Sequence, residues 1–333
     1  MKKIKALFGF GLALCATAAL ASCGDDKGGE VYADKDARTI AVLKYGTHTS
    51  LDEIEDGVVS TLESGLSNDY KIKTYDCNFD STLIAQTLTK IKDDDLAAIV
   101  AIATPVAVQA ANNFTDVPVV FAAVSDPQSA GVLDSNVTGT SDAMQLNKLI
   151  DLAREVDSDA NDFGYIYTST ESNSVANAKT LKSLASSMNF NLTTKTINGT
   201  AEITETFNAI KDKGIDALIV SDDNNVAAGM DTLSSLCASN DIAMYCAADS
   251  EVKDGGMMGY SVSYSALATY TGEQVLQIVR DRKAVSDVEV KYFNDEADLN
   301  LYYNSGFFAK CSKYDQLVTA DIRARGTDLF KNE

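Results

Sequence analysis

The sequence predicts an α/β protein with two doubly wound, Rossmann-like lobes and a ligand cleft between them. Three observations lead to this fold class. From Arg38 onward, short apolar runs alternate with amphipathic segments, which is the pattern of strands and helices around a parallel sheet. The pattern reaches a fifth strand near residue 140 and restarts at Leu146. The chain is also longer than a single hydrophobic core usually allows.

The first block begins with a strand over residues 39–45. Ser50 and Glu53 then fit a capping box that would satisfy the free amides of a helix over residues 51–66. The segment 96–103 is almost entirely apolar, as a strand buried on both faces requires. The other expected elements of this block are strands at 70–75, 117–124 and 137–140 and helices at 81–92 and 106–113.

The second block repeats this alternation over a similar length. Strands are expected at residues 163–168, 191–197, 217–220, 242–246 and 257–262, and helices at 146–156, 173–188, 202–211, 225–238 and 264–279. Two further strands, at 288–292 and 299–303, close the series. With only three prolines in the chain, several short crossings between lobes are expected instead of one flexible linker.

The N-terminus carries the signature of a lipoprotein leader. Lys2, Lys3 and Lys5 precede an uncharged apolar stretch, which ends in small residues before Cys23. We predict that residues 1–22 are a signal peptide, that Cys23 is lipidated, and that residues 23–37 are a disordered tether. The predicted location is extracytoplasmic, anchored to the membrane through the lipid alone. An ordinary cleaved signal with an incidental Cys23 is the alternative.

Composition limits the choice of partners. The whole chain has 28 basic and 48 acidic residues, a net charge of −20. Removing the three leader lysines leaves 25 basic residues against 48 acidic ones, or −23. This charge argues against nucleic acid as a partner. The remaining cysteines at 77, 237, 246 and 311 are too sparse for a disulfide framework, so we expect buried thiols.

Polar loops follow the expected strands, and ligands of open α/β sheets bind beyond the carboxyl ends of strands. These loops precede helix starts, where free amides favour a ligand carboxylate. Asp223 is predicted to meet an ammonium inside the cleft and to matter more for binding than any other carboxylate of the second block. Its neighbour Asp222 is expected to contribute far less if it faces solvent. The same residue types are ordinary helix caps, so each loop alone is weak evidence. The loops are at residues 46–50, 104–105, 125–127, 169–174 and 221–225.

Catalytic signatures are mostly missing from the chain. His48 is the only histidine, which excludes a multi-histidine metal site, and no nucleotide-binding loop or serine elbow is present. We therefore predict a binding protein that needs no metal and no cofactor and is not an enzyme. A surface-anchored hydrolase using carboxylates and a sensory ligand-binding module remain the alternatives.

Six stretches of the chain are distinctive in combination. They are residues 47–52 (THTSLD), 99–105 (IVAIATP), 119–127 (VVFAAVSDP), 136–142 (NVTGTSD), 171–174 (ESNS) with Tyr167, and 223–224 (DN). Together they resemble the extracytoplasmic substrate-binding proteins of the family that includes the tryptophan/tyrosine ABC-uptake lipoproteins, and the resemblance runs from about Thr39 to about Gly306. Ser263 stands where that family tends to have Asp, and Thr49 where it usually has Pro.

The resemblance implies a fold like that of type I periplasmic binding proteins and delivery of an amino acid, often aromatic, to an ABC permease and its ATPase. Lobe 1 is expected at 38–142 plus about 262–293, and lobe 2 at 143–261 plus about 294–333. The expected ligand-binding residues are Tyr45, His48, Thr104, Ser125, Asp126, Tyr167, Glu171, Ser172, Asn173, Asp223, Asn224 and Tyr264.

Overall fold

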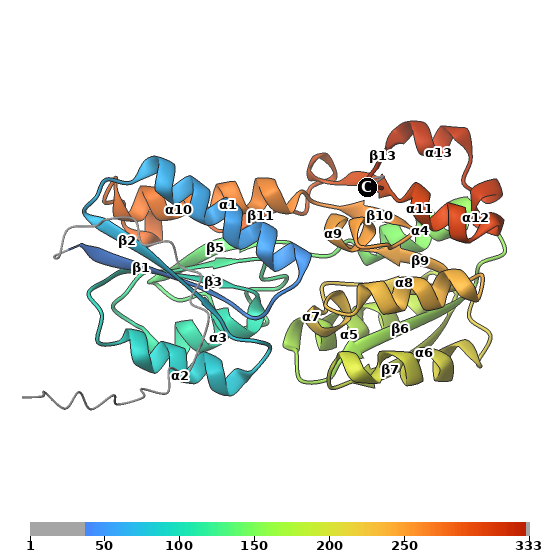
Figure 1. Cartoon of the computed structure of the whole chain (residues 1–333), viewed down its shortest axis with the longest axis horizontal. Helices are drawn as coiled ribbons and strands as arrows, with labels where there is room; N and C mark the ends of the chain where they lie inside the picture. The colour runs from blue at the N-terminus through green and yellow to red at the C-terminus, as the bar shows by residue number, and fades with distance from the viewer. Residues whose placement is uncertain (1–36, 331–333) are drawn as a thin grey trace, which may run out of the picture.

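The computed structural model describes residues 37–330, which form two sheets, each with its own hydrophobic core (Figure 1). The first sheet has the strand order β11-β5-β4-β3-β1-β2, and all neighbouring strands in it are parallel. Its strands are β1 (Arg38–Lys44), β2 (Tyr70–Asp76), β3 (Leu96–Ile102), β4 (Val119–Ala122), β5 (Val137–Ser141) and β11 (Lys291–Tyr292). Every residue of β3 is buried, as its unbroken apolar sequence predicts.

Two pairs of helices cover the faces of the first sheet (Figure 1). One pair is α1 (Thr49–Gly65) with α10 (Tyr264–Val279), and the other is α2 (Ser81–Ile91) with α3 (Thr104–Asn113). The helices α1 and α10 approach so closely at Gly57 that a Cβ atom on this residue would lie only 2.6 Å from the Cβ of Ala268. This packing places the first residues of both helices at the same edge of the lobe.

The second sheet has the order β13-β12-β10-β9-β8-β6-β7, and only the β10–β12 pair is antiparallel. Its strands are β6 (Asp162–Thr168), β7 (Asn191–Ile197), β8 (Ala217–Val220), β9 (Ala243–Cys246), β10 (Met258–Ser261), β12 (Asn300–Tyr303) and β13 (Gly326–Asp328). The helices around it are α4 (Leu146–Val156), α5 (Ser172–Ser187), α6 (Ile203–Lys211), α7 (Asn224–Ala227), α8 (Met230–Ser239), α9 (Asp249–Lys253), α11 (Ser305–Lys310), α12 (Ser312–Leu317) and α13 (Ala320–Arg325). Short 3₁₀ turns are η1 (Thr200–Glu202), η2 (Val285–Asp287) and η3 (Glu296–Asp298).

The two sheets share one topology. The first five strands of each block run in the spatial order second, first, third, fourth, fifth. This order reverses direction between β1 and β3 in one sheet and between β6 and β8 in the other, and such switch points are where α/β sheets bind ligands. The predicted two-lobed, doubly wound α/β fold is therefore confirmed.

The chain crosses between the sheets three times, after β5, β10 and β11. We propose that these crossings divide the described chain into lobe 1, residues 38–142 with 262–293, and lobe 2, residues 143–261 with 294–330. The predicted leader, Cys23 and the tether, apart from Ala37, lie outside the described residues. Within residues 37–330, no helix has the length and apolar character needed to cross a bilayer.

Local elements differ from the sequence predictions in several places. The capping box is wrong: α1 begins at Thr49, His48 is its N-cap residue, and the Ser50 hydroxyl hydrogen-bonds to Ser250 instead. The helix expected at 225–238 is broken at Gly229 into α7 and α8. The strand expected at 288–292 shrinks to two residues, and short helices follow β12 that no apolar pattern announced. The cysteines at positions 77, 237, 246 and 311 are buried free thiols, as the sequence predicts.

Candidate ligand-binding site

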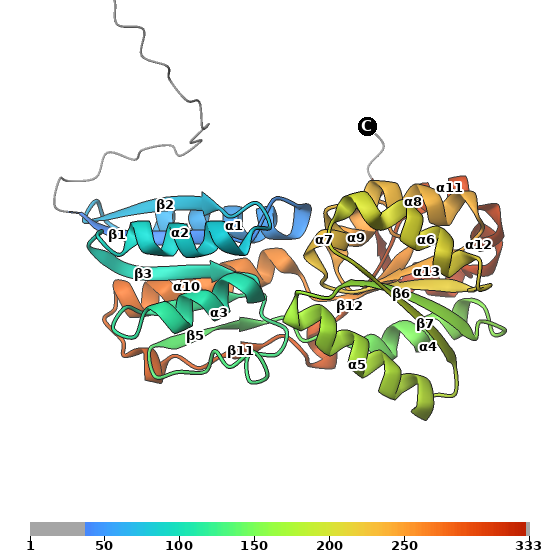
Figure 2. The same cartoon turned by 90° about the horizontal axis from the view of Figure 1, so that it is seen from below.

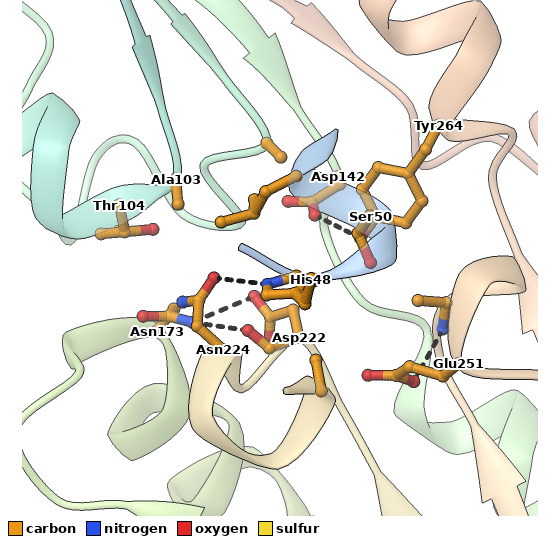
Figure 3. A pocket seen from close by; sticks show the side chains of 14 residues that line it. His48, Ser50, Ala103, Thr104, Asp142, Asn173, Asp222, Asn224, Glu251 and Tyr264 are labelled. Carbon is orange, nitrogen blue, oxygen red and sulfur yellow. Dashed lines mark hydrogen bonds between the residues drawn. The ribbon is translucent and has the colours of Figure 1, made fainter. Parts of the chain in front are cut away.

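A small cavity lies between the lobes, beyond the carboxyl ends of the strands (Figure 3). Its volume is about 20 Å³, which is room for about one water molecule. An amino acid therefore requires the lobes or the lining side chains to move. The lining residues are His48, Ser50, Leu51, Ala103, Thr104, Ala123, Asp142, Asn173, Asp222, Asn224, Ala227, Ala248, Glu251 and Tyr264.

Hydrogen bonds and one ion pair join the lobes around this cavity. His48 Nε2 lies 3.2 Å from Asn224 Oδ1, and the Ser50 and Ser250 hydroxyls are 2.5 Å apart. The Ser125 hydroxyl donates to Asp222, and Lys253 pairs with Glu53 on α1. Figure 2 shows the two lobes side by side. The lobes are thus in direct contact across the cavity.

His48 begins the lobe 1 side of the site, directly after β1. Asn224 donates its Nδ2 hydrogen to Glu171 Oε2, so its Oδ1 accepts from the His48 ring. Nε2 of His48 therefore carries the proton, and Nδ1 is an acceptor. Burial lowers the pKa of His48 to about 4, so the ring is neutral at physiological pH.

Asp142 supplies a carboxylate from the end of β5. Its side chain is 3% exposed, and its Oδ2 accepts a 2.8 Å hydrogen bond from the Tyr264 hydroxyl at the start of α10. Burial raises the pKa of Asp142. Ser263, the residue before Tyr264, caps α10 by accepting from the Ala266 amide, so the serine at this position has a structural function.

Asp222 provides the carboxylate of lobe 2. It receives hydrogen bonds from Ser125 of lobe 1 and from Asn173 and Asn177 on α5. Burial and the nearby charge of Asp142 raise the pKa of Asp222 to about 7. Asp222 therefore lies in the cavity and does not meet the condition, a side chain facing solvent, under which it was expected to contribute little to binding.

Asp223 lies within the protein interior of lobe 2 and not at the cavity, where it was expected. Its side chain is fully buried, and its oxygens accept hydrogen bonds from Thr168 N and Oγ1 at 2.5 and 2.9 Å. A third hydrogen bond, 3.0 Å long, comes from Val226 N, which caps α7. Asp223 does not line the cavity. The geometry thus favours the capping interpretation and gives this carboxylate the task of joining β6 to α7.

Glu171 also lies behind the cavity wall. It is 1% exposed and accepts hydrogen bonds from the side chains of Asn224 and Asn225. Burial and the charge of Asp223 raise its pKa to about 8. Glu171 therefore positions Asn224, which in turn contacts His48.

Five of the twelve expected binding residues line the cavity: His48, Thr104, Asn173, Asn224 and Tyr264. Ser125 is adjacent, through Asp222. Tyr45 is buried against Phe79, and Tyr167 stacks on Tyr165 with ring centroids 5.4 Å apart. Ser172 is exposed. Asp126 is exposed and accepts from Ser129 in its own turn. These tyrosines pack against other aromatic side chains instead of forming a cavity wall.

The alanines and the acidic residues of the lining were not predicted as binding residues from the sequence. Asp142 could have been found, because it follows the end of a strand just as the chosen loops do. Ala103 and Ala123 have φ angles of 77° and 53° directly after β3 and β4, and this left-handed backbone is strained for alanine. No residue type in the sequence signals that strain. Such strain clusters at functional sites.

The lining is acidic. Asp142, Asp222 and Glu251 line the cavity, and within the part of the chain that the structure describes no lysine or arginine does. Among residues 37–330, no group of three or more His, Cys, Asp and Glu side chains is arranged to hold a metal ion. Burial raises the pKa of all three acids, and a cationic group carried by a ligand would favour their ionised forms.

A sequence profile described as "ABC transporter substrate binding protein" matches residues 39–310. The chain belongs to this family. A relative named tyrosine-binding protein, from Clostridioides difficile, is 28% identical over 265 residues, which is 77% of this chain and 76% of that protein. The predicted resemblance is thereby confirmed.

Solved structures of substrate-binding proteins give the same fold. The ABC domain from Streptococcus pneumonia in complex with L-Trp superposes with a TM-score of 0.78 at 25% identity, covering 88% of this chain and 99% of that one. A ligand-free, open substrate-binding protein from Clostridium difficile gives 0.61 at 28% identity, covering 82% and 94%.

Proposed function

We propose that this substrate-binding protein captures an aromatic amino acid outside the cytoplasm and delivers it to an ABC permease and its ATPase. The observation that carries the proposal is the acidic, two-sided cavity at the switch points of both sheets. The relatives support it, since one is named for tyrosine and another was solved with L-Trp. Alanines at 103, 123, 227 and 248 with Leu51 give the cavity a small apolar wall, which leaves space for a ring once the lobes separate slightly.

Closure of the lobes is the proposed mechanism of capture. A ligand that contacts both lobes binds the closed protein more tightly than the open protein, and this difference in affinity stabilises the closed arrangement. The contacts of His48 with Asn224 and of Ser125 with Asp222 hold the lobes together in this closed arrangement, and the permease recognises the closed protein. The protein is proposed to release its ligand unchanged, with no catalytic step.

Calorimetry with all twenty amino acids tests the ligand class. We expect heat from tyrosine, tryptophan or phenylalanine only, and a rise in melting temperature, because a ligand bound only to the folded state stabilises it. The chain has 14 tyrosines and no tryptophan, so bound tryptophan is expected to accept energy from tyrosine and emit as the only indole. Absence of binding by every aromatic amino acid would refute the proposed ligand. Chromatographic recovery of an altered ligand would favour the hydrolase alternative.

Anchoring through Cys23 is the second part of the proposal, supported by the leader pattern. One acyl chain gives only marginal membrane binding, so two or more chains are expected. We expect Cys23→Ala to remain an unlipidated precursor. Labelled fatty acid that still enters this variant would contradict the assignment.

A further inference from the structure

Three polar contacts join the first turn of α1 in lobe 1 to α9 and its C-cap in lobe 2. Residues three or four positions apart lie on one face of a helix, so positions 49, 50 and 53 face positions 250, 253 and 254. We call these contacts the α1–α9 latch. The Ser50 and Ser250 hydroxyls are 2.5 Å apart, Glu53 forms an ion pair with Lys253, and the Thr49 hydroxyl donates to the Asp254 carboxylate.

The ion pair of the latch lies outside the ligand cavity. Ser50 lines the cavity, whereas Glu53, Ser250 and Lys253 line a separate open groove of about 610 Å³ between the lobes. Because Glu53 and Lys253 do not line the cavity, their contact does not depend on which molecule the cavity binds. It depends only on how closely the two lobes approach.

Lys253 is the one basic residue that lines this groove in the described chain. The acids that line it are Glu53 and Asp56 of lobe 1 and Asp249 and Asp328 of lobe 2. Burial and the charge of Glu53 raise the pKa of Asp249 to about 7, which shows that these two carboxylates repel each other across the lobes. The charge of Lys253 therefore offsets a repulsion that opposes closure.

We propose that the α1–α9 latch sets the share of ligand-free protein that is closed, and that Lys253 is the residue on which the latch depends. It rests on the proposed function, in which an amino acid is held between the two lobes. Only the closed arrangement completes the site, so the apparent affinity falls in proportion to the closed share. The ion pair then changes the affinity for every ligand by one factor and leaves the preference among ligands unchanged.

Lys253→Met tests the latch by calorimetry with tyrosine and with tryptophan. The variant keeps a long side chain and removes its charge, and pH 8 keeps Asp249 ionised. We expect both affinities to fall by the same factor, about three- to tenfold, because a surface ion pair is worth up to about fivefold and the repulsion it offset is then exposed. Glu53→Gln should weaken binding by about twofold or less, since it removes the repulsion toward Asp249 together with the ion pair.

Lys73→Met is the matched control. Lys73 pairs with Asp94 at 2.8 Å within lobe 1, and these side chains are 39% and 28% exposed, against 36% and 30% for Lys253 and Glu53. The control removes an ion pair of similar exposure that does not join the lobes. Both affinities should therefore stay at their wild-type values.

Energy transfer between dyes on the two lobes measures the closed share without any ligand. In a mature chain with Cys23→Ser, Gln86→Cys on α2 and Ser183→Cys on α5 place the dyes at exposed positions, whereas the thiols at 77, 237, 246 and 311 are buried. We expect Lys253→Met to lower the closed share. In 1 M NaCl, where charges are screened beyond about 3 Å, its affinity should differ from that of the wild type by about twofold at most.

The outcomes separate the latch from the proposed function. An unchanged closed share in Lys253→Met, or a loss of affinity for only one of the two amino acids, would overturn the latch and leave an amino-acid receptor. If neither amino acid binds, the proposed ligand fails, and the closed share still decides on the latch. If Lys253→Met does not fold, the exchanged pair Glu53→Lys with Lys253→Glu decides: a closed share above that of Lys253→Glu alone supports the latch, and an equal one overturns it.

Discussion

Exchanging the carboxylates at positions 222 and 223 for amides, one at a time, separates binding from stability. Asp222 lines the cavity and Asp223 is enclosed by protein donors. We expect Asp222→Asn to lose affinity with little loss of stability, and Asp223→Asn to lose stability first. Because the two residues are adjacent and the substitution is the same, each variant is the control for the other.

The magnitude for Asp223→Asn follows from its three hydrogen bonds. One carboxylate oxygen faces Thr168 N, and the other faces Thr168 Oγ1 and Val226 N. Whichever way the amide turns, its NH₂ group faces one backbone N–H, and that buried donor is left unpaired. Such a group costs about 1–3 kcal/mol. We therefore expect a net loss of about 2 kcal/mol.

The expected loss for Asp222→Asn lies in binding. Asn can keep an acceptor toward Asn177 and donate to Ser125, so the lobe contact survives. The cavity loses one negative charge facing the ligand, which we expect to weaken binding about ten- to a hundredfold.

Thermal unfolding of the ligand-free protein and calorimetry with the bound amino acid measure the two effects. We expect the melting temperature of Asp223→Asn to fall by roughly 4–8 °C and that of Asp222→Asn to change little. The reasoning is refuted if Asp223→Asn unfolds like the wild type and binds weakly while Asp222→Asn binds normally.

Two further predictions follow from the buried acids and the small lining residues. Burial, together with the charge of Asp223, raises the pKa of Glu171 from 4.5 to about 8. The folded protein therefore binds this proton more tightly than the unfolded chain, and the stability that results is fully present below pH 4.5 and is lost as pH rises to 8. The ligand-free protein should accordingly unfold at a lower urea concentration at pH 8 than at pH 5.5. Glu171→Gln should reduce this dependence of stability on pH. A stability that rises toward pH 8 would contradict the argument. Ala227→Leu should fill the cavity of about 20 Å³ and remove the ligand-induced rise in melting temperature, whereas Ala85→Leu on the exposed side of α2 should leave that rise intact.

The sequence by itself determined the fold and the edge of the sheets where the site lies. Apolar runs such as 96–103 require strands covered on both faces, and a doubly wound sheet brings the loops after its strands to one edge. For this reason His48, Thr104, Asn173 and Asn224 could be chosen from the sequence, and all four line the cavity. The lipid anchor is also a sequence prediction, and it lies outside the described residues.

The tertiary structure alone decided which side chains enter the cavity. Asp222 and Asp223 are equivalent in the sequence, and they differ because Asp223 meets Thr168 on β6, 55 residues away, whereas Asp222 meets Ser125 of the other lobe. Ser50 fits a capping box, yet its hydroxyl bonds to Ser250 across the lobes. A hydrogen bond between distant residues depends on how the whole chain packs, and local sequence patterns carry no record of such partners.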